Sequence, residues 1–255
     1  MRINGRGSVG EAVKAVVLAA GKGTRLMSED SDVPKVMRLA SGEPLLRYVL
    51  DALSFIERKD IIIVVGYKKD EITDYFRDYS YAEQTVQLGT GHAVLAASDM
   101  LRGFGGAVLV CYGDMPLIRQ DTYLSLIGVH FEQGNDCTLL TGESTVRLPF
   151  GRIIRDGNGE FVSVVEESDC TREQLAITEL NSGVYVFRAP LLLDALLSIK
   201  PDNAQGEYYL TDVPAIMRGN GAKVGIHRRD LGNEIIGVNT SEQLKQAEGI
   251  IKVRS

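Results

Sequence analysis

The sequence predicts an α/β fold, a doubly wound and mostly parallel Rossmann-like sheet with a β-rich insertion in its second half. Short runs of β-branched and aliphatic residues alternate with amphipathic stretches, a pattern typical of parallel strands with helices on both faces. These runs are continuously apolar, as expected for strands that are covered on both sides. A Gly-rich segment, "GKGTR" at 21–25, directly follows the first run. Ligands of open parallel sheets lie at such carboxyl ends of strands.

The elements follow in chain order from these periodicities. In the first half, short β-branched and continuously apolar runs predict strands at 15–20, 61–65 and 107–111, and amphipathic stretches predict helices at 45–55, 71–76, 90–101 and 121–132. From about residue 136 the pattern changes. "DGNG" at 156–159 separates two alternating runs and predicts a β-hairpin. Helices return at 190–198, 212–218 and 241–251. With no composition break that would mark a linker, we expect one domain over 14–255, preceded by a short extension at 1–13.

Composition limits the classes of partner. The 28 basic and 34 acidic residues give a net charge of −6, which argues against nucleic acid. The three cysteines contain no CxxC pair, so a reducing cytoplasm is expected rather than a disulfide framework or a zinc site. The longest apolar stretches are far shorter than the roughly 20 residues of a membrane helix, so no membrane partner is expected. The sequence leaves a monomer and a homo-oligomer both open.

The Gly-rich loop after the first strand is a candidate anion site. Its glycines allow backbone N–H groups to approach a phosphate closely, and Lys22 and Arg25 add positive charge. A P-loop is excluded because Val16 stands where its first glycine is required and Gly23 follows the lysine. A dinucleotide fingerprint is excluded because Leu26 replaces its third glycine. A turn without a ligand remains the alternative on this segment alone.

Three later segments carry further candidates. Asp114 follows the strand at 107–111, where a carboxylate can hold Mg²⁺ or cap the next turn. Lys35 is either a charge that faces phosphate or an isolated surface lysine. "QLGTGHA" at 87–93 is a second glycine-bearing entry into a helix, suited to contact a base or a phosphate through backbone amides. His92 lies inside that predicted helix and is interpreted as a packed or hydrogen-bonded histidine.

Nucleophilic catalysis by the protein is not supported. The sequence has no Gly-x-Ser-x-Gly elbow, and none of its cysteines lies in a recognisable nucleophile setting. Glu166 and Glu167 are adjacent and would point to opposite faces of a strand, so at most one of them can face a given pocket.

Taken together, eight motifs resemble the sugar-1-phosphate nucleotidyltransferases. They are "LAAGKGTR" at 18–25, "PKV" at 34–36, "QLGTGHA" at 87–93, "YGD" at 112–114, "FGR" at 150–152, "NSG" at 181–183, "NAQGEYYLTDV" at 203–213 and "GVN" at 237–239. The likeness runs from about residue 13 to about residue 248. It is strongest to the N-acetylglucosamine-1-phosphate uridylyltransferases, the pyrophosphorylase half of bifunctional bacterial uridylyltransferase/acetyltransferases. No hexapeptide repeat follows, so no acetyltransferase β-helix domain is expected in this chain.

The resemblance implies a nucleotide-binding half at about 14–135 and a sugar-binding half at about 136–235. It implies Mg²⁺-assisted in-line attack of N-acetylglucosamine-1-phosphate on the α-phosphate of UTP. By matched position, Arg25 and Lys35 would be catalytic, and Asp114 and Asn239 would hold the metal. The nucleotide would be bound by Leu18, Ala19, Ala20, Gly21, Gly23, Thr24, Gln84, Gly89, Thr90, Tyr112 and Gly113. The sugar would be lined by Gly151, Glu166 and Asn181, with Asn239 also counted among the substrate-binding residues.

Two departures from the family pattern lie beside the expected phosphates. The segment "LMSEDSDVP" at 26–34 is longer than usual, and Met37-Arg38 replaces the usual Leu-His. Two alternatives therefore accompany the leading hypothesis. One is a nucleotidyltransferase for another sugar-1-phosphate or nucleotide, and the other is a catalytically silent regulatory protein that binds nucleotide sugars.

Overall fold

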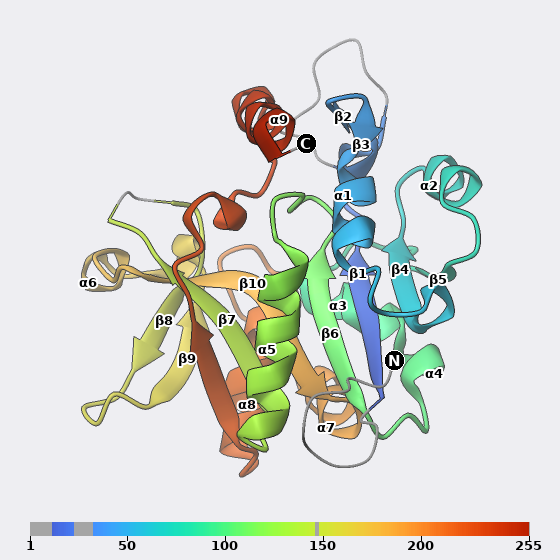
Figure 1. Cartoon of the computed structure of the whole chain (residues 1–255). Helices are drawn as coiled ribbons and strands as arrows, with labels where there is room; N and C mark the ends of the chain where they lie inside the picture. The colour runs from blue at the N-terminus through green and yellow to red at the C-terminus, as the bar shows by residue number, and fades with distance from the viewer. Residues whose placement is uncertain (1–11, 23–32, 146–147, 255) are drawn as a thin grey trace.

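The structure, a computed structural model, describes residues 12–22, 33–145 and 148–254 and confirms the predicted α/β class (Figure 1). Its main sheet has the strand order β11-β7-β10-β6-β1-β4-β5, and a hairpin of β8 and β9 joins it through β10. Along that path β10 is antiparallel to both of its neighbours, while the other adjacent pairs are parallel. The strands are β1 (Val13–Leu18), β4 (Ile61–Val65), β5 (Ser80–Glu83), β6 (Ala107–Tyr112), β7 (Cys137–Glu143), β8 (Arg152–Arg155), β9 (Phe161–Val165), β10 (Glu179–Arg188) and β11 (Val224–Arg228).

Helices cover both faces of this sheet, and each face has its own hydrophobic core. Alternate residues of one strand enter different cores, so that Val17 and Ile63 join one cluster and Val16 and Ile62 join the other. The first core is closed by α1 (Leu45–Ala52), α2 (Lys69–Tyr75) and α5 (Gln120–Glu132). The second is closed by α3 (Thr90–Ala96), α4 (Ser98–Leu101), α7 (Ala189–Leu196) and α8 (Val213–Gly219). Figure 1 shows α5 in front of the sheet and α7 and α8 behind it.

Burial on both faces explains why the strands are continuously apolar. All five residues of β4 are buried, and this strand begins and ends where the sequence predicts. The expected helix at 90–101 is interrupted at Ala97, which separates α3 from α4. The predicted hairpin is confirmed by β8 and β9, whose turn is closed by the Asp156 N–H donating to the Glu160 carbonyl at 3.0 Å.

The second half of the chain contributes more to the sheet than an insertion would. Strands β7, β10 and β11, which the sequence patterns did not single out, extend the central sheet, and only the β8–β9 hairpin projects from it. Ten-residue β10 pairs antiparallel with β6 on one side and with β7 on the other. The two predicted halves therefore share one continuous sheet.

The order of the strands creates a crevice at the carboxyl ends of β1 and β6. From β1 the chain first adds β4 and β5 on one side and then returns to add β6 on the other. Leu18 and Tyr112, the last residues of these two strands, are register partners. Such a change of direction is where open α/β sheets bind ligands.

The last helix lies beside this crevice. In Figure 1, α9 (Ser241–Arg254) packs near the small ribbon of β2 (Leu39–Ala40) and β3 (Glu43–Pro44). Their contact is a third apolar cluster that includes Ala40, Val238 and Ala247. This packing holds the segment just before α9 against the loop after β6.

Residues 1–11 of the N-terminal extension predicted at 1–13 lie outside the described residues. Strand β1 begins at Val13. A short helix, α6 (Arg172–Leu175), precedes β10 in the chain. Over the ranges that the structure describes, no helix combines the length and the apolar character needed to cross a membrane.

Candidate active site

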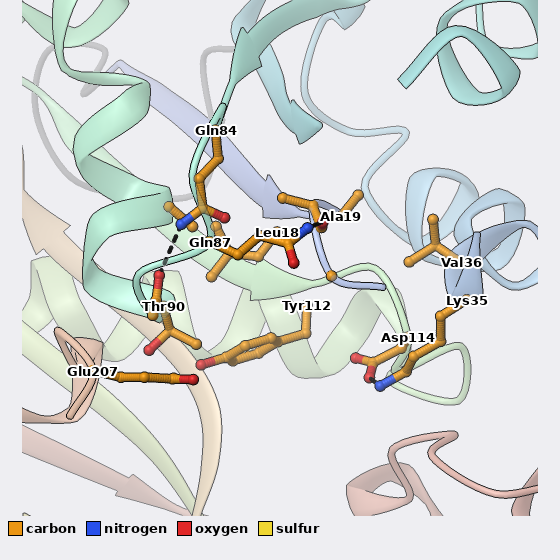
Figure 2. Close-up of a pocket in the computed structure, with 14 residues that line it drawn as sticks. Leu18, Ala19, Lys35, Val36, Gln84, Gln87, Thr90, Tyr112, Asp114 and Glu207 are labelled. Atoms are coloured by element: carbon orange, nitrogen blue, oxygen red, sulfur yellow. Dashed lines mark hydrogen bonds and ion pairs between the residues drawn. The ribbon is translucent and has the colours of Figure 1, made fainter. Parts of the chain in front are cut away.

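Two cavities meet at the carboxyl ends of β1 and β6. The first has a volume of about 270 Å³ and is lined by Leu18, Ala19, Ala20, Gly21, Lys35, Val36, Gln84, Gln87, Gly89, Thr90, Ala93, Tyr112, Asp114 and Glu207 (Figure 2). The second has a volume of about 280 Å³ and is lined by Lys35, Tyr112, Asp114, Met115, Pro149, Phe150, Gly151, Glu166, Asn181, Ser182, Gly183, Gly237 and Asn239. Both cavities share Lys35, Tyr112 and Asp114. A ligand with two parts could therefore bind across this shared boundary.

One end of the first cavity presents the amide of Gln84. This side chain is only 5% exposed, and its Nε2 donates to the Gly89 carbonyl at 3.0 Å. Figure 2 shows the Gln84 amide on the same side of the cavity as Thr90, with its oxygen directed toward the interior of the cavity. A planar base with one ring N–H between two carbonyls would complement an amide oxygen in this position.

The loop that contains Gly89 is braced by the segment 207–210. Gly89 has φ of 113°, and a Cβ there would lie 2.6 Å from the carbonyl oxygen of Tyr208. The Gly91 N–H donates to the same carbonyl at 2.7 Å, and the Leu210 N–H donates to the Thr90 hydroxyl oxygen at 3.0 Å. The close backbone contact explains why a glycine is required, and it assigns a structural role to part of the "GEYYL" segment.

The turn after β1 is held by neighbouring strands and loops. The Ala19 N–H donates to the Val64 carbonyl at 2.9 Å, and the Ala20 carbonyl accepts from Gln87 Nε2 at 2.7 Å. No described atom of another segment lies within 4 Å of a Cβ built on Gly21, so the backbone of the turn is open to a ligand there. Of the loop residues predicted from sequence, Gly23, Thr24 and Arg25 lie outside the described residues.

Three polar side chains meet at the boundary between the cavities. Lys35 forms an ion pair with Asp114, and its ammonium also donates to Asn239 Oδ1 at 2.7 Å. The Lys35 and Asp114 side chains are 15% and 16% exposed, so solvent screens this contact only in part. They come from three distant segments: Lys35 lies in a short 3-10 helix after Pro34, Asp114 follows β6, and Asn239 precedes α9.

The backbone fixes this cluster in place. The Val238 N–H donates to the Asp114 carbonyl at 2.9 Å, which joins the two loops that carry the oxygen atoms. Asn239 Nδ2 faces the Gly237 carbonyl at 3.4 Å, so its Oδ1 is the atom turned toward Lys35. Val36, the buried residue after Lys35, packs against Gly113. A Cβ on Gly113 would lie 3.1 Å from Cγ1 of Val36.

The donor set fits Mg²⁺. In the described part of the chain no three His, Cys, Asp or Glu side chains gather into a site that could hold a metal by themselves. Mg²⁺ at phosphate-transfer sites usually takes only one or two protein oxygens and completes its shell with phosphates and water. Asp114 and Asn239 supply two such oxygens around a point that already attracts the ammonium of Lys35.

The second cavity is built around β10 and the start of β8. Gly151 accepts from the Asn181 N–H at 2.9 Å, and a Cβ on Gly151 would lie 2.7 Å from Val164 Cγ1. The Asn181 amide donates to the Tyr185 hydroxyl at 2.6 Å. The buried guanidinium of Arg152 donates to the Leu148 and Phe150 carbonyls. These contacts shape a rigid wall next to the shared boundary.

Glu166 is the acidic group of the second cavity. Burial raises the pKa of its carboxyl group, the charges of Asp169 and Asp212 add to the rise, and the nearby Thr211 hydroxyl opposes it. Glu167 does not line the cavity, in agreement with the expectation that only one of the two adjacent carboxylates can face it. A partly buried carboxylate suits recognition of sugar hydroxyl groups, because each of them can donate to it.

Tyr112 separates the two cavities. Its ring packs against Gly183, where φ is 81° and a Cβ would lie 2.6 Å from Tyr112 Cε2. Burial raises the pKa of the Tyr112 hydroxyl well above its usual range, and a hydrogen bond with Thr90 opposes this shift. Tyr112 is therefore a neutral wall rather than a source of charge.

Most residues expected from sequence line one of these cavities. Gly113 does not: its backbone N–H donates to the Leu18 carbonyl at 2.9 Å, and its α-carbon faces Val36 and Leu46. Sequence reasoning missed Gln87 and Glu207 in the first cavity. The signals that could have found them are the first letter of "QLGTGHA" and the acidic residue of "GEYY".

Comparison with known proteins agrees with this geometry. The family model of the MobA-like NTP transferase domain matches residues 15–206, which include both Gly-rich loops and Asp114. The chain belongs to this NTP transferase family. Nucleotidyltransferases of this kind act on a nucleoside triphosphate and a sugar phosphate and generally use a divalent metal ion.

Two curated relatives are GlmU proteins of bacteria. The chain is 42% identical over 245 residues to the bifunctional protein GlmU of Caldanaerobacter subterraneus subsp. tengcongensis, and covers 52% of that protein with 96% of its own length. It is 42% identical over 241 residues to the bifunctional protein GlmU of Streptococcus thermophilus, an alignment that covers 94% of this chain and 52% of that protein. The chain thus spans about half the length of these curated relatives.

Solved structures support the fold. A UDP-glucose pyrophosphorylase in its apo form gives a TM-score of 0.77 at 17% identity, with 95% of this chain and 99% of that chain covered. A putative glucose-1-phosphate thymidylyltransferase from Bacillus anthracis gives a TM-score of 0.71 at 17% identity, with 94% and 95% covered. At this identity the likeness concerns the fold alone.

Proposed function

We propose that this chain transfers UMP from UTP to N-acetylglucosamine-1-phosphate and releases pyrophosphate. The observation that carries the proposal is the pair of adjoining cavities with Lys35, Asp114 and Asn239 at their boundary. A nucleotide in the first cavity and a sugar phosphate in the second would bring their phosphates together at this cluster. The similarity to GlmU proteins over at least 94% of the chain supports the choice of substrates.

The reaction needs positioning and charge neutralisation more than proton transfer. The attacking oxygen belongs to a phosphate that is already ionised, so no general base is required. As the oxygen attacks the α-phosphorus in line, negative charge develops on the departing pyrophosphate. A fixed ammonium group such as that of Lys35 stabilises this charge more in the transition state than in the ground state.

The neighbouring residues orient the substrates. The backbone turn at 19–21 and the predicted Arg25 would bind the triphosphate, and the Gln84 amide would face the base. Asp114 and Asn239 would hold Mg²⁺, which when bound supplies a second positive charge beside the phosphates. Glu166 and Asn181 would face the hexosamine in the second cavity.

The first test is pyrophosphate release from UTP and N-acetylglucosamine-1-phosphate, with Mg²⁺ and with EDTA. Parallel reactions replace the sugar phosphate by glucose-1-phosphate and UTP by the other nucleoside triphosphates. Release that depends on the metal and favours this pair supports the proposal. Preferred turnover of another pair would move the activity to a related transferase, and tight binding of UDP-sugars without any turnover would indicate a regulatory protein.

A lysine variant tests the role of the boundary cluster. Lys35→Ala is expected to lower kcat by about 10² to 10³, the usual loss when one electrostatic stabiliser is removed from an active site. Lys200→Ala serves as the matched control, because Lys200 is exposed and lines neither cavity. Near-normal turnover of a folded Lys35→Ala protein would exclude this lysine from the mechanism.

We propose that the reaction takes place in the cytoplasm. The scattered cysteines fit a reducing compartment, where nucleoside triphosphates are also present.

A further inference from the structure

We infer that His92 is a positioning residue that determines which atom of the Gln84 amide is presented to the nucleotide base. This inference rests on the proposed nucleotidyltransferase function. It assigns a role in base selection to a side chain that does not itself line the first cavity. The chemistry selected is a pyrimidine whose ring nitrogen carries a proton.

The geometry around Gln84 engages both protons of its amide nitrogen. Gln84 Nε2 lies 3.0 Å from the Gly89 carbonyl oxygen and 3.0 Å from His92 Nδ1. A carbonyl oxygen can only accept a hydrogen bond, so the amide group that faces it must be the NH₂. The second N–H then points to His92 Nδ1, which must accept, and the imidazole proton lies on Nε2.

This arrangement leaves the Gln84 carbonyl oxygen for the ligand. Gln84 Oε1 has no hydrogen-bond partner among the described residues, although the side chain is 5% exposed. In Figure 2 this oxygen is directed into the first cavity. An acceptor at this place attracts the N3–H of uracil and opposes the N3 lone pair of cytosine.

His92 also lies close to Tyr208 and to several apolar side chains. It lies in the first turn of α3, and its ring centroid is 6.5 Å from that of Tyr208. With Leu88, Leu95 and Ile199, both residues line a separate, mostly apolar cavity of about 250 Å³. These contacts fix the place of the ring whose Nδ1 accepts from Gln84.

Two substitutions separate positioning from packing. His92→Leu fills the apolar space and removes the acceptor, whereas His92→Asn retains an oxygen near the place of Nδ1. In the wild-type protein kcat/KM is expected to favour UTP over CTP. His92→Leu should reduce this preference by about tenfold, equivalent to about 1.4 kcal/mol. His92→Asn should keep it within about twofold.

The preference ratio identifies the role. A purely structural histidine would lower kcat/KM for UTP and CTP by the same factor, and that result for His92→Leu would overturn the inference. Equal loss of preference in His92→Asn and His92→Leu would also overturn it. Absence of UTP turnover in the wild-type protein would instead contradict the proposed function.

An NMR measurement is independent of turnover. The chain has three histidines, so ¹⁵N imidazole signals of the intact wild-type protein can be assigned by comparing the His92→Asn spectrum. The expected signature is an unprotonated Nδ1 and a protonated Nε2 at His92. A proton on Nδ1 of the wild-type protein would overturn the inference, whatever the effect of the variants on turnover.

Discussion

Replacing Gly89 by alanine is expected to disturb the base-facing end of the first cavity more than any side-chain truncation in the same loop. Gly89 has φ of 113° and ψ of 175°, a backbone region that is essentially restricted to glycine. A Cβ at this position would lie 2.6 Å from the Tyr208 carbonyl oxygen and 2.7 Å from the Tyr208 nitrogen. Both atoms belong to backbone, so a side-chain rotation cannot relieve the overlap.

The cost follows from these contacts. Forcing alanine into this backbone region costs about 1 to 3 kcal/mol. Separating the two segments also weakens the hydrogen bonds of Gly91 N–H to the Tyr208 carbonyl and of Tyr208 N–H to the Leu88 carbonyl, each worth about 0.5 to 1.5 kcal/mol. The expected loss of unfolding free energy is therefore about 2 to 6 kcal/mol. The Gly89 carbonyl also accepts a hydrogen bond from Gln84, so the substitution should displace the Gln84 amide. If this displacement weakens binding of the base by about 1.4 kcal/mol, KM for UTP rises about tenfold.

Urea unfolding and steady-state kinetics with UTP measure these two effects. Gly128→Ala is the matched control, because Gly128 lies inside α5 and a Cβ at that position would meet no described atom of another segment within 4 Å. That substitution should stabilise the protein by up to about 1 kcal/mol through the higher helix propensity of alanine. A Gly89→Ala protein with wild-type stability and wild-type KM would refute the argument that the loop conformation requires glycine.

Three further outcomes are expected. Burial lowers the pKa of His130 from 6.5 to about 4, so the stability it contributes is present above pH 6.5 and is lost as pH falls toward 4. Between pH 6.5 and 4 the unfolding free energy of His130→Leu should therefore fall by about 3 kcal/mol less than that of the wild type, as measured by acid unfolding. Because burial raises the folded-state pKa of Glu166, wild-type stability should fall as pH rises through that pKa. Thermal melts should therefore find Glu166→Gln more stable than wild type at neutral pH, with the difference vanishing below about pH 4.5, while its KM for the sugar phosphate rises. Asn239→Leu should raise the Mg²⁺ concentration needed for half-maximal rate in a metal titration, and an unchanged titration would remove Asn239 from the metal site.

The order of elements and much of the site could be predicted from sequence because the signals are local. The apolar run at 61–65 coincides with β4, and "DGNG" at 156–159 lies in the turn of the β8–β9 hairpin. Glycine-bearing loops at 19–21 and 88–91 follow strands or begin a helix, and both line the first cavity. The individual motifs were ambiguous, but their order along the chain was sufficient to predict the family.

The long strand β10, its neighbour β7 and the edge strand β11 were not singled out from sequence. Strand β10 contains "NSG", with Gly183 at φ of 81° and a register shift between Asn181 and Tyr185. A polar interruption of this kind weakens a sequence-based strand assignment, although pairing with β6 and β7 on either side stabilises the strand in the fold. For the same reason the second half was expected as an insertion, whereas its strands continue the main sheet.

The sequence by itself determined the α/β class, the two glycine-bearing loops and the residue types that can bind phosphate and metal, because periodicity and turn chemistry act over a few residues. Tertiary structure decided which of these residues meet. Lys35 and Asn239 are separated by 204 positions, yet their side chains are 2.7 Å apart because a 3-10 helix and the loop before α9 converge on the end of β6. Contacts of this kind arise only when distant elements pack, and no local pattern encodes them.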